Sequence, residues 1–407
     1  MWKKLLLPQL LLFSLYLCYS KLYCFIEETA PKSHSYFLGR RNQLMTQQRQ
    51  RNYSIDFWRI LFTYLVILYH LEIFFQREDR FFECCYLSVE FFFILSGFFM
   101  ARHAENDTEP APKRASCTYI FHRFRQLYPA FLVAWTASFL SWILKARFVN
   151  AVPVSLVRTI QEHVWELSLL WMLVPGNKTF VYVSWYISSM LIASYFIYWL
   201  LKAKKNTSVG FIFPLSIILI YSFFGTWNQG IDFHYDFKTI VSSGLLRAFA
   251  GLSIGCISFY VFKNVYKHLE TLIRVPYRKF LLSICELLVI LFLIRILFGS
   301  EHSNLNFIAI PLFMVLLMLE FGSYTFLSDI LNKGKFFGFL GKTSIGAYLN
   351  QEMLFPFFAS LSDAHPHWNF TLISALCLVV CTLTGIVSYY LILGIKRLLQ
   401  SVVKPQF

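Results

Sequence analysis

Long apolar runs, separated by short polar segments, dominate the pattern of the chain. Ten runs stand out, over residues 55–75, 84–101, 126–144, 182–201, 209–226, 239–262, 280–298, 305–321, 336–358 and 370–393. Each is close to the length of about twenty residues that an α-helix needs to cross the hydrocarbon core of a bilayer. The pattern predicts an all-α polytopic membrane protein in which about ten transmembrane helices form one bundle.

The segments between these runs are too short for a separate soluble domain. We expect a single ten-span domain over residues 45–407, and no internal sequence repeat divides it. One outer segment, near 160–176, contains the apolar stretch "VWELSLLWMLV", which is too short to cross a bilayer. This stretch is predicted to be an interfacial or re-entrant piece, which either roofs a cavity or packs as a surface helix.

Composition and charge distribution agree with this class. The chain of 407 residues is 57% hydrophobic and only 14% charged, whereas soluble domains carry about 25% charged residues. With the residues before 55 on the cytoplasmic side, the inner segments hold 22 Lys and Arg and the outer segments hold 7. The positive-inside rule then places both ends of the bundle in the cytoplasm.

The net charge of +15 raises the alternative of nucleic-acid binding. The Lys and Arg residues, however, cluster in short segments between apolar runs rather than along one groove-binding stripe. The expected partner is therefore the lipid bilayer and not a nucleic acid. The nine Cys show no C-x-x-C or Cys/His spacing, so they indicate apolar fillers, and no metal site is expected.

Residues 1–44 do not fit the ten-span pattern. Their opening stretch "MWKKLLLPQLLLFSLYLCYS" is typical of a signal peptide or of an extra span. A crossing there with its lysines inside puts the basic stretch from Arg40 to Arg51 outside, against the charge distribution. We therefore expect 1–44 to be a signal-like leader or a non-native extension, with natural translation starting at Met45.

The first span, "IDFWRILFTYLVILYH" over 55–70, holds two ionisable side chains that are unusual inside a membrane. Arg59 and His70 are separated by about three helical turns, so they share one helix face and lie about 16 Å apart along the axis. Ionisable groups inside a span are costly and usually face a partner or a cavity. The plainer alternatives are an arginine that snorkels to the surface and a histidine that bonds a neighbouring helix.

Other spans also place polar side chains in the outer half of the bilayer, at a depth similar to that of His70. They are Glu90 in the second span, Arg247 in the sixth, and Asn350, Gln351 and Glu352 in the ninth. We expect them to converge with His70, with Arg247 and residues 350–352 binding the acceptor or lining a cavity. Isolated hydrogen bonds between helices are the alternative. Three further polar residues in or near spans, Glu286, Arg295 and Glu320, receive no role from the sequence.

These residue types suit one chemistry. A neutral histidine near a carboxylate can act as a general base, which deprotonates a hydroxyl as it attacks an acyl carbonyl; His70 and Glu90 fit these roles. The inner loop "YIFHRFRQLYPAF" places Arg123 and Arg125 at the cytoplasmic surface, where arginines can hold the phosphates of a nucleotide-bearing donor. Ordinary positive-inside anchors are the alternative for both arginines.

At these residues the chain resembles the acyltransferase 3 family of bacterial membrane O-acyltransferases. The motifs that carry the resemblance are "DFWRILFTYLVILYH" at 56–70, "VEFFFILSGFFM" at 89–100 and "RFRQLYPAF" at 123–131. Looser matches are "SWYISSMLIA" at 184–193, "LLRAFAGLSIG" at 245–255 and "LGKTSIGAYL" at 340–349. Their order and spacing extend over the whole predicted bundle.

The resemblance implies that an acyl group, usually acetyl from acetyl-CoA, moves to a hydroxyl of an extracytoplasmic glycan or lipid-linked saccharide. Capsule, exopolysaccharide and lipopolysaccharide are such glycans, and the implied location is the bacterial cytoplasmic membrane. The resemblance makes His70 the essential catalytic histidine, Arg59 its companion and the loop at Arg123 the donor site. Two positions depart from the family pattern: Gln126 stands at the second arginine of Arg-x-x-Arg, and Gln351 stands where many members have histidine.

Other classes of function remain open at this point. A transporter or glycan flippase would use the buried polar residues as a path, but such proteins often show internal repeats with helices broken at equivalent positions, and the chain shows no such symmetry. A non-catalytic sensor or scaffold would not need His70. A glycan polymerase is a further enzymatic alternative, although the chain has no large outer domain for it.

Overall fold

The computed structural model describes residues 51–149, 155–228, 230–232, 241–272, 275–299 and 304–403. All regular structure in this part of the chain is helical, so the predicted all-α class is confirmed. The expected leader over 1–44 and the expected start at Met45 lie outside the described residues, as does most of the outer stretch 227–240.

Ten long helices carry the apolar runs, and each predicted run falls on one of them within the described residues. They are α3 (Tyr53–Phe74), α4 (Ser88–Asn106), α5 (Pro112–Leu144), α8 (Trp185–Thr207), α9 (Phe213–Phe223), α10 (Ser243–Leu272), α11 (Val275–Leu297), α12 (Ala309–Gly322), α14 (Lys335–Ala364) and α15 (Phe370–Val403). The short α-helices are α6 (Leu156–Glu162), α7 (Val164–Leu167) and α13 (Phe326–Asn332). Single turns of 3-10 or π geometry are η1 (Glu83–Leu87), η2 (Lys145–Val149), η3 (Trp171–Leu173), η4 (Tyr182–Ser184), η5 (Ser208–Ile212), η6 (Phe224–Asn228) and η7 (Asn304–Ile308).

The chain is a multi-pass membrane protein. Of the described helical stretches, seven are long and apolar enough to cross a bilayer. The number is eight if Asn306–Gly322 and Phe326–Asn332, bent by 64°, form one broken span. The stretch Tyr182–Thr226 counts once among the seven, although the backbone kinks inside it at Lys204. Ten crossings and a cytoplasmic position for both ends therefore stay predictions.

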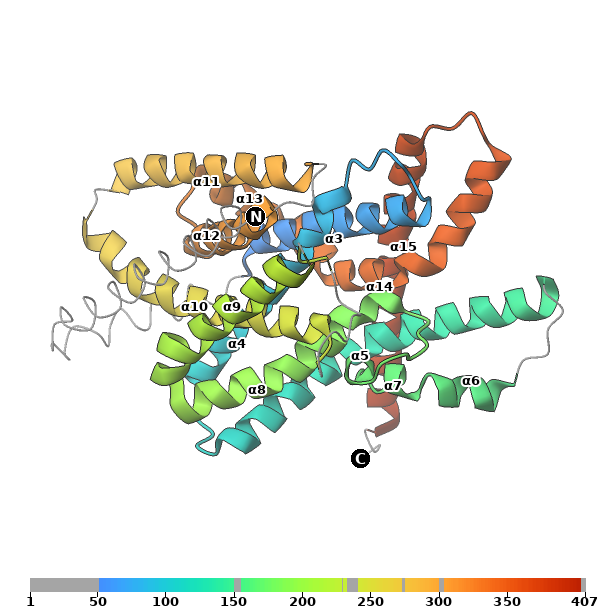
Figure 1. Ribbon diagram of the computed structural model, residues 1–407, viewed down its shortest axis with the longest axis horizontal. Coiled ribbons are helices and arrows are strands. Elements are labelled where there is room, and N and C mark those ends of the chain that lie inside the picture. Colours follow the sequence, from blue (N-terminus) through green and yellow to red (C-terminus); the bar gives the residue numbers. More distant parts are fainter. Residues whose placement is uncertain are drawn as a thin grey trace.

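Helix α3 lies inside the bundle, in contact with several other long helices. It packs against α4, α12, α13, α14 and α15. Figure 1 shows α3 between α11 to α13 on one side and α14 with α15 on the other. The helix that carries both Arg59 and His70 is thus enclosed by protein.

The start of α3 is held by a buried carboxylate to which the sequence assigned no role. Glu320, near the end of α12, accepts hydrogen bonds from the Trp58 indole at 2.6 Å and from the Ser328 hydroxyl at 2.6 Å. The Ser54 hydroxyl donates to the same carboxylate, and the Asn52 amide donates to the Glu320 carbonyl oxygen at 2.9 Å. These contacts fix the position of α3 against α12 and α13.

Two glycines let α4 and α10 approach closely. A Cβ atom at Gly97 would lie 2.1 Å from the carbonyl oxygen of Leu252, and one at Gly255 would lie 2.1 Å from that of Ile94. Membrane helices pack through such small residues because the lipid gives them no hydrophobic drive to associate. The close packing brings the N-terminal half of α4, which carries Glu90, against α10.

We expect Gly97→Leu and Gly255→Leu to destabilise the protein by about 3 kcal/mol or more, because a backbone carbonyl cannot move aside for the new side chain. Thermal unfolding of the detergent-solubilised protein measures this loss. Gly394→Leu is the matched control, since a Cβ at Gly394 meets no atom within 4 Å. Equal melting temperatures for all three variants would contradict the close packing of α4 on α10.

Candidate functional site

His70 lies near the C-terminal end of α3, on the face that packs against α14. Its Nδ1 is 3.3 Å from the side-chain oxygen of Gln351, and Gln351 is fully buried. Protein atoms surround the imidazole, yet the ring is only half-buried. The imidazole is thus packed among helices and keeps some accessible surface.

Arg59 lies on the same helix, nearer its N-terminal end. Its Nη1 is 3.2 Å from Oδ1 of Asp56, which also binds Arg51. Protein surrounds the guanidinium, yet 32% of the Arg59 side chain stays accessible. Arg59 is thus packed among protein atoms and keeps accessible surface.

The structure separates the two arginines predicted to bind the donor. Arg123 points inward: it lies within electrostatic range of Arg59 and of the Tyr186 hydroxyl, and its Nη1 donates to Gln126 at 3.1 Å. Arg125 is exposed, and its guanidinium lies 5.6 Å from the centre of the Phe121 ring. Only Arg123 therefore shares an interior region with Arg59.

Glu90 and Arg247 form an ion pair at the close contact of α4 and α10. Nε of Arg247 is 2.9 Å from Oε1 of Glu90, and both side chains are at most 1% exposed. The Tyr221 hydroxyl donates to the other carboxylate oxygen at 3.2 Å, and the guanidinium lies 5.1 Å from the centre of the Trp185 ring. Within the described part of the chain no hydrogen bond joins Glu90 or Arg247 to His70. The pair and its two aromatic neighbours instead connect four helices, α4, α8, α9 and α10.

Asp232, to which the sequence analysis gave no role, contacts Tyr69, the residue before His70 in the chain. The Tyr69 hydroxyl donates a hydrogen bond to the Asp232 carboxylate. Asp232 also lies within electrostatic range of Arg247 and Tyr86. The stretch around Asp232, "WNQGIDFHYDF" at 227–237, is rich in aromatic and polar residues, and this composition was the only indication in the sequence of a role for Asp232.

The three consecutive polar residues of α14 face three different partners. Asn350 donates to the Ser388 hydroxyl of α15 at 3.0 Å, and Glu352 accepts from the backbone N–H of Tyr182 at 2.8 Å. Gln351, between them, faces His70. Successive residues of a helix are rotated by about 100°, so only one of the three can face α3.

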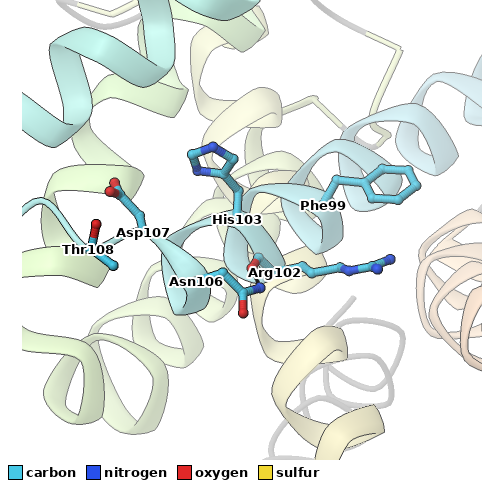
Figure 2. A pocket seen from close by; sticks show the side chains of 6 residues that line it. All are labelled: Phe99, Arg102, His103, Asn106, Asp107 and Thr108. Carbon is cyan, nitrogen blue, oxygen red and sulfur yellow. Dashed lines mark hydrogen bonds between the residues drawn. The ribbon is translucent and has the colours of Figure 1, made fainter. Parts of the chain in front are cut away.

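A pocket of about 420 Å³ lies at the C-terminal end of α4, far along the helix from Glu90. It is lined by Phe99, Arg102, His103, Asn106, Asp107 and Thr108 (Figure 2). His103 lies within electrostatic range of Arg123, and its Nδ1 is 2.8 Å from the Tyr198 hydroxyl. Although burial opposes it, the hydrogen bond from Tyr198 holds the pKa of Asp107 below its ordinary value. The pocket thus combines fixed charges of both signs, and the sequence pattern did not predict it.

Sets of three or more His, Cys, Asp or Glu side chains placed to hold a metal ion do not occur in the described part of the chain.

Comparison with known proteins adds one finding. The family model of the acyltransferase 3 family, described as an acyltransferase domain, matches residues 52–391. This range contains every candidate site residue. No curated protein and no solved structure matches the chain.

We expect Arg247→Met to destabilise the protein by about 3–5 kcal/mol, because it leaves the Glu90 carboxylate buried without its countercharge. The double variant Glu90→Leu with Arg247→Met should recover most of this loss, since it removes both charges. Thermal stability in detergent measures both effects, with the exposed Arg125→Met as control. A double variant no more stable than Arg247→Met alone would show that charge neutralisation is not what the pair provides.

Proposed function

The chain belongs to the acyltransferase 3 family, and from this premise we propose that it transfers an acetyl group from cytoplasmic acetyl-CoA to a hydroxyl of an extracytoplasmic glycan. The membrane is the bacterial cytoplasmic membrane in this proposal. Capsule, exopolysaccharide, lipopolysaccharide and lipid-linked saccharides are the acceptor class.

The observation that carries the proposal is an imidazole enclosed by helices that still has accessible surface. His70 combines these two properties. A base in such a place is shielded from bulk water and still open to small reacting groups. In the proposed reaction His70 takes the hydroxyl proton as the acceptor oxygen attacks the thioester carbonyl. The new C–O bond forms, the C–S bond breaks, and the proton passes from His70 to the departing thiolate.

The inner side supports an anionic donor. Arg59 and Arg123 lie within electrostatic range of each other, and Arg123 contacts an amide, with no carboxylate bound to it among the described residues. Arg59 has a carboxylate partner, Asp56, whereas Arg123 has none among the described residues, so positive charge remains to bind an anion. Arginine binds phosphate groups by paired hydrogen bonds. The donor phosphates would bind there, and the acyl end of the donor would extend along α3 for about 16 Å to reach His70.

The outer side supports a hydroxyl-rich acceptor. Tyr69, whose ring centre lies 5.2 Å from that of His70, donates to the Asp232 carboxylate, and Tyr182 lies beside Glu352 of α14. Carboxylate, phenol and aromatic faces are the groups with which proteins bind sugar hydroxyls and rings. A glycan from the far side of the membrane would thus meet the imidazole without crossing the cytoplasmic half.

We expect His70→Ala and His70→Gln to reduce O-acetylation of the surface glycan by roughly 10²–10⁴-fold, the usual contribution of a general base. NMR of O-acetyl groups on glycan from cells that express each variant measures the effect. Immunoblots of membranes must show equal amounts of protein. Acetylation equal to wild type would contradict His70 as the base.

We expect Arg123→Ala to raise the KM for acetyl-CoA about 10–100-fold, because charge-assisted hydrogen bonds contribute about 1.5–3 kcal/mol each. Arg125→Ala is the matched control and should keep the wild-type KM, since Arg125 is exposed and points away from Arg59. Kinetics of the purified protein in proteoliposomes distinguish the two. Equal effects of the two substitutions would mean that the inward position of Arg123 has no part in donor binding.

A further inference from the structure

Gln351 has two features that a residue serving only to pack α14 would not need together. Its side-chain oxygen lies 3.3 Å from Nδ1 of His70. Its side-chain nitrogen is buried and has no hydrogen-bond partner in the described structure. The residue itself is 0% exposed, so water outside the protein does not satisfy that nitrogen.

The first feature determines which nitrogen of His70 can accept a proton. An amide oxygen only accepts hydrogen bonds, so a neutral His70 bonded to it carries its hydrogen on Nδ1. The lone pair then lies on Nε2, the nitrogen that points away from Gln351. Because an amide has no charge, it orients the ring without stabilising the protonated imidazolium as a carboxylate would.

The second feature indicates a binding partner that arrives with a ligand. Buried N–H groups are nearly always hydrogen-bonded in native proteins, so an unpartnered one needs an explanation. Gln351 lies beside His70, which is packed among helices and keeps some accessible surface. The acceptor that belongs in such a place is the carbonyl oxygen of a thioester, which gains negative charge when an alcohol adds to it.

The neighbours of Gln351 explain why its side chain stays aimed at His70. Asn350 is tied to Ser388 of α15, and Glu352 is tied to the backbone of Tyr182. These contacts hold α14 on either side of Gln351 and oppose rotation of the helix about its axis. The side chain is thereby positioned by two elements besides α3.

We propose that Gln351 has two roles in acyl transfer: its oxygen orients His70 with the free lone pair on Nε2, and its N–H donates to the acyl carbonyl. The proposal rests on the acyltransferase function proposed above. In the reaction the acceptor hydroxyl gives its proton to Nε2 as its oxygen bonds to the carbonyl carbon. The carbonyl electron pair moves onto oxygen, which the Gln351 N–H stabilises. Collapse of this intermediate breaks the C–S bond, and the imidazolium returns the proton to the thiolate.

The test compares Gln351→Leu and Gln351→Glu with wild type, using the full-length protein in proteoliposomes with acetyl-CoA and a glycan acceptor. Gln351→Leu removes both contacts and should lower kcat about 10²–10³-fold, the usual effect of losing one oxyanion donor, with little change in the KM for acetyl-CoA. Gln351→Glu keeps an acceptor for Nδ1 and removes the donor, so its kcat should fall as well. Its carboxylate stabilises the imidazolium, so the rise of kcat/KM with pH should move to higher pH.

Each outcome bears on a separate part of the proposal. A wild-type kcat in Gln351→Glu would overturn the carbonyl contact, and an unshifted pH profile would overturn the contact with His70. Thr343→Val is the control for damage to α14, because Thr343 is a buried residue of the same helix whose hydroxyl donates within α14, to the Leu340 carbonyl oxygen; an equal loss of kcat there would also overturn the proposal. If wild type transfers no acetyl group, the function proposed above fails; if wild type is active and Gln351→Leu is too, only this inference fails.

Discussion

Every ionisable side chain buried in this bundle has to be neutralised or hydrogen-bonded by protein, because neither lipid nor an apolar core solvates charge. Glu90 and Arg247 meet this need together, and Glu320 meets it with donors from α3 and α13. Each of these contacts joins different helices, so satisfying the charge also determines how the helices pack. The glycines between α4 and α10 contribute to this, because they allow the two helices to approach closely enough for the 2.9 Å ion pair to form.

Two groups near Arg59 and His70 keep hydrogen-bonding capacity for a ligand. Arg123 contacts an amide where an acid would neutralise it, and Gln351 keeps an unpartnered N–H beside His70. Both lie near side chains that are enclosed by protein and yet accessible, namely Arg59 and His70. The satisfied pairs give the bundle its rigidity, and the unsatisfied donors lie along the interior between its inner and outer sides.

Much of the fold could be predicted from the lengths of the apolar runs, since all ten fall on helices. The helical period also predicts that Arg59 and His70 share one face of α3, which is a continuous helix over both residues. The polar residues predicted to converge with His70 form two separate contacts among the described residues, Glu90 with Arg247 and His70 with Gln351. Depth can be counted along a helix, whereas the partner at that depth depends on which helix lies opposite.

The sequence by itself determined the class of the protein, the helices and the family, because apolar length and ordered motifs are properties of neighbouring residues along the chain. Only the tertiary structure decided which polar groups act together. Residues 350–352 looked equivalent until the rotation of α14 against α3 turned Gln351 alone toward His70, and the neighbouring arginines at 123 and 125 proved to face inward and outward. Helix rotation and adjacency are set by packing between distant segments, through contacts such as those of Glu320 and Gly97, and no local pattern encodes them.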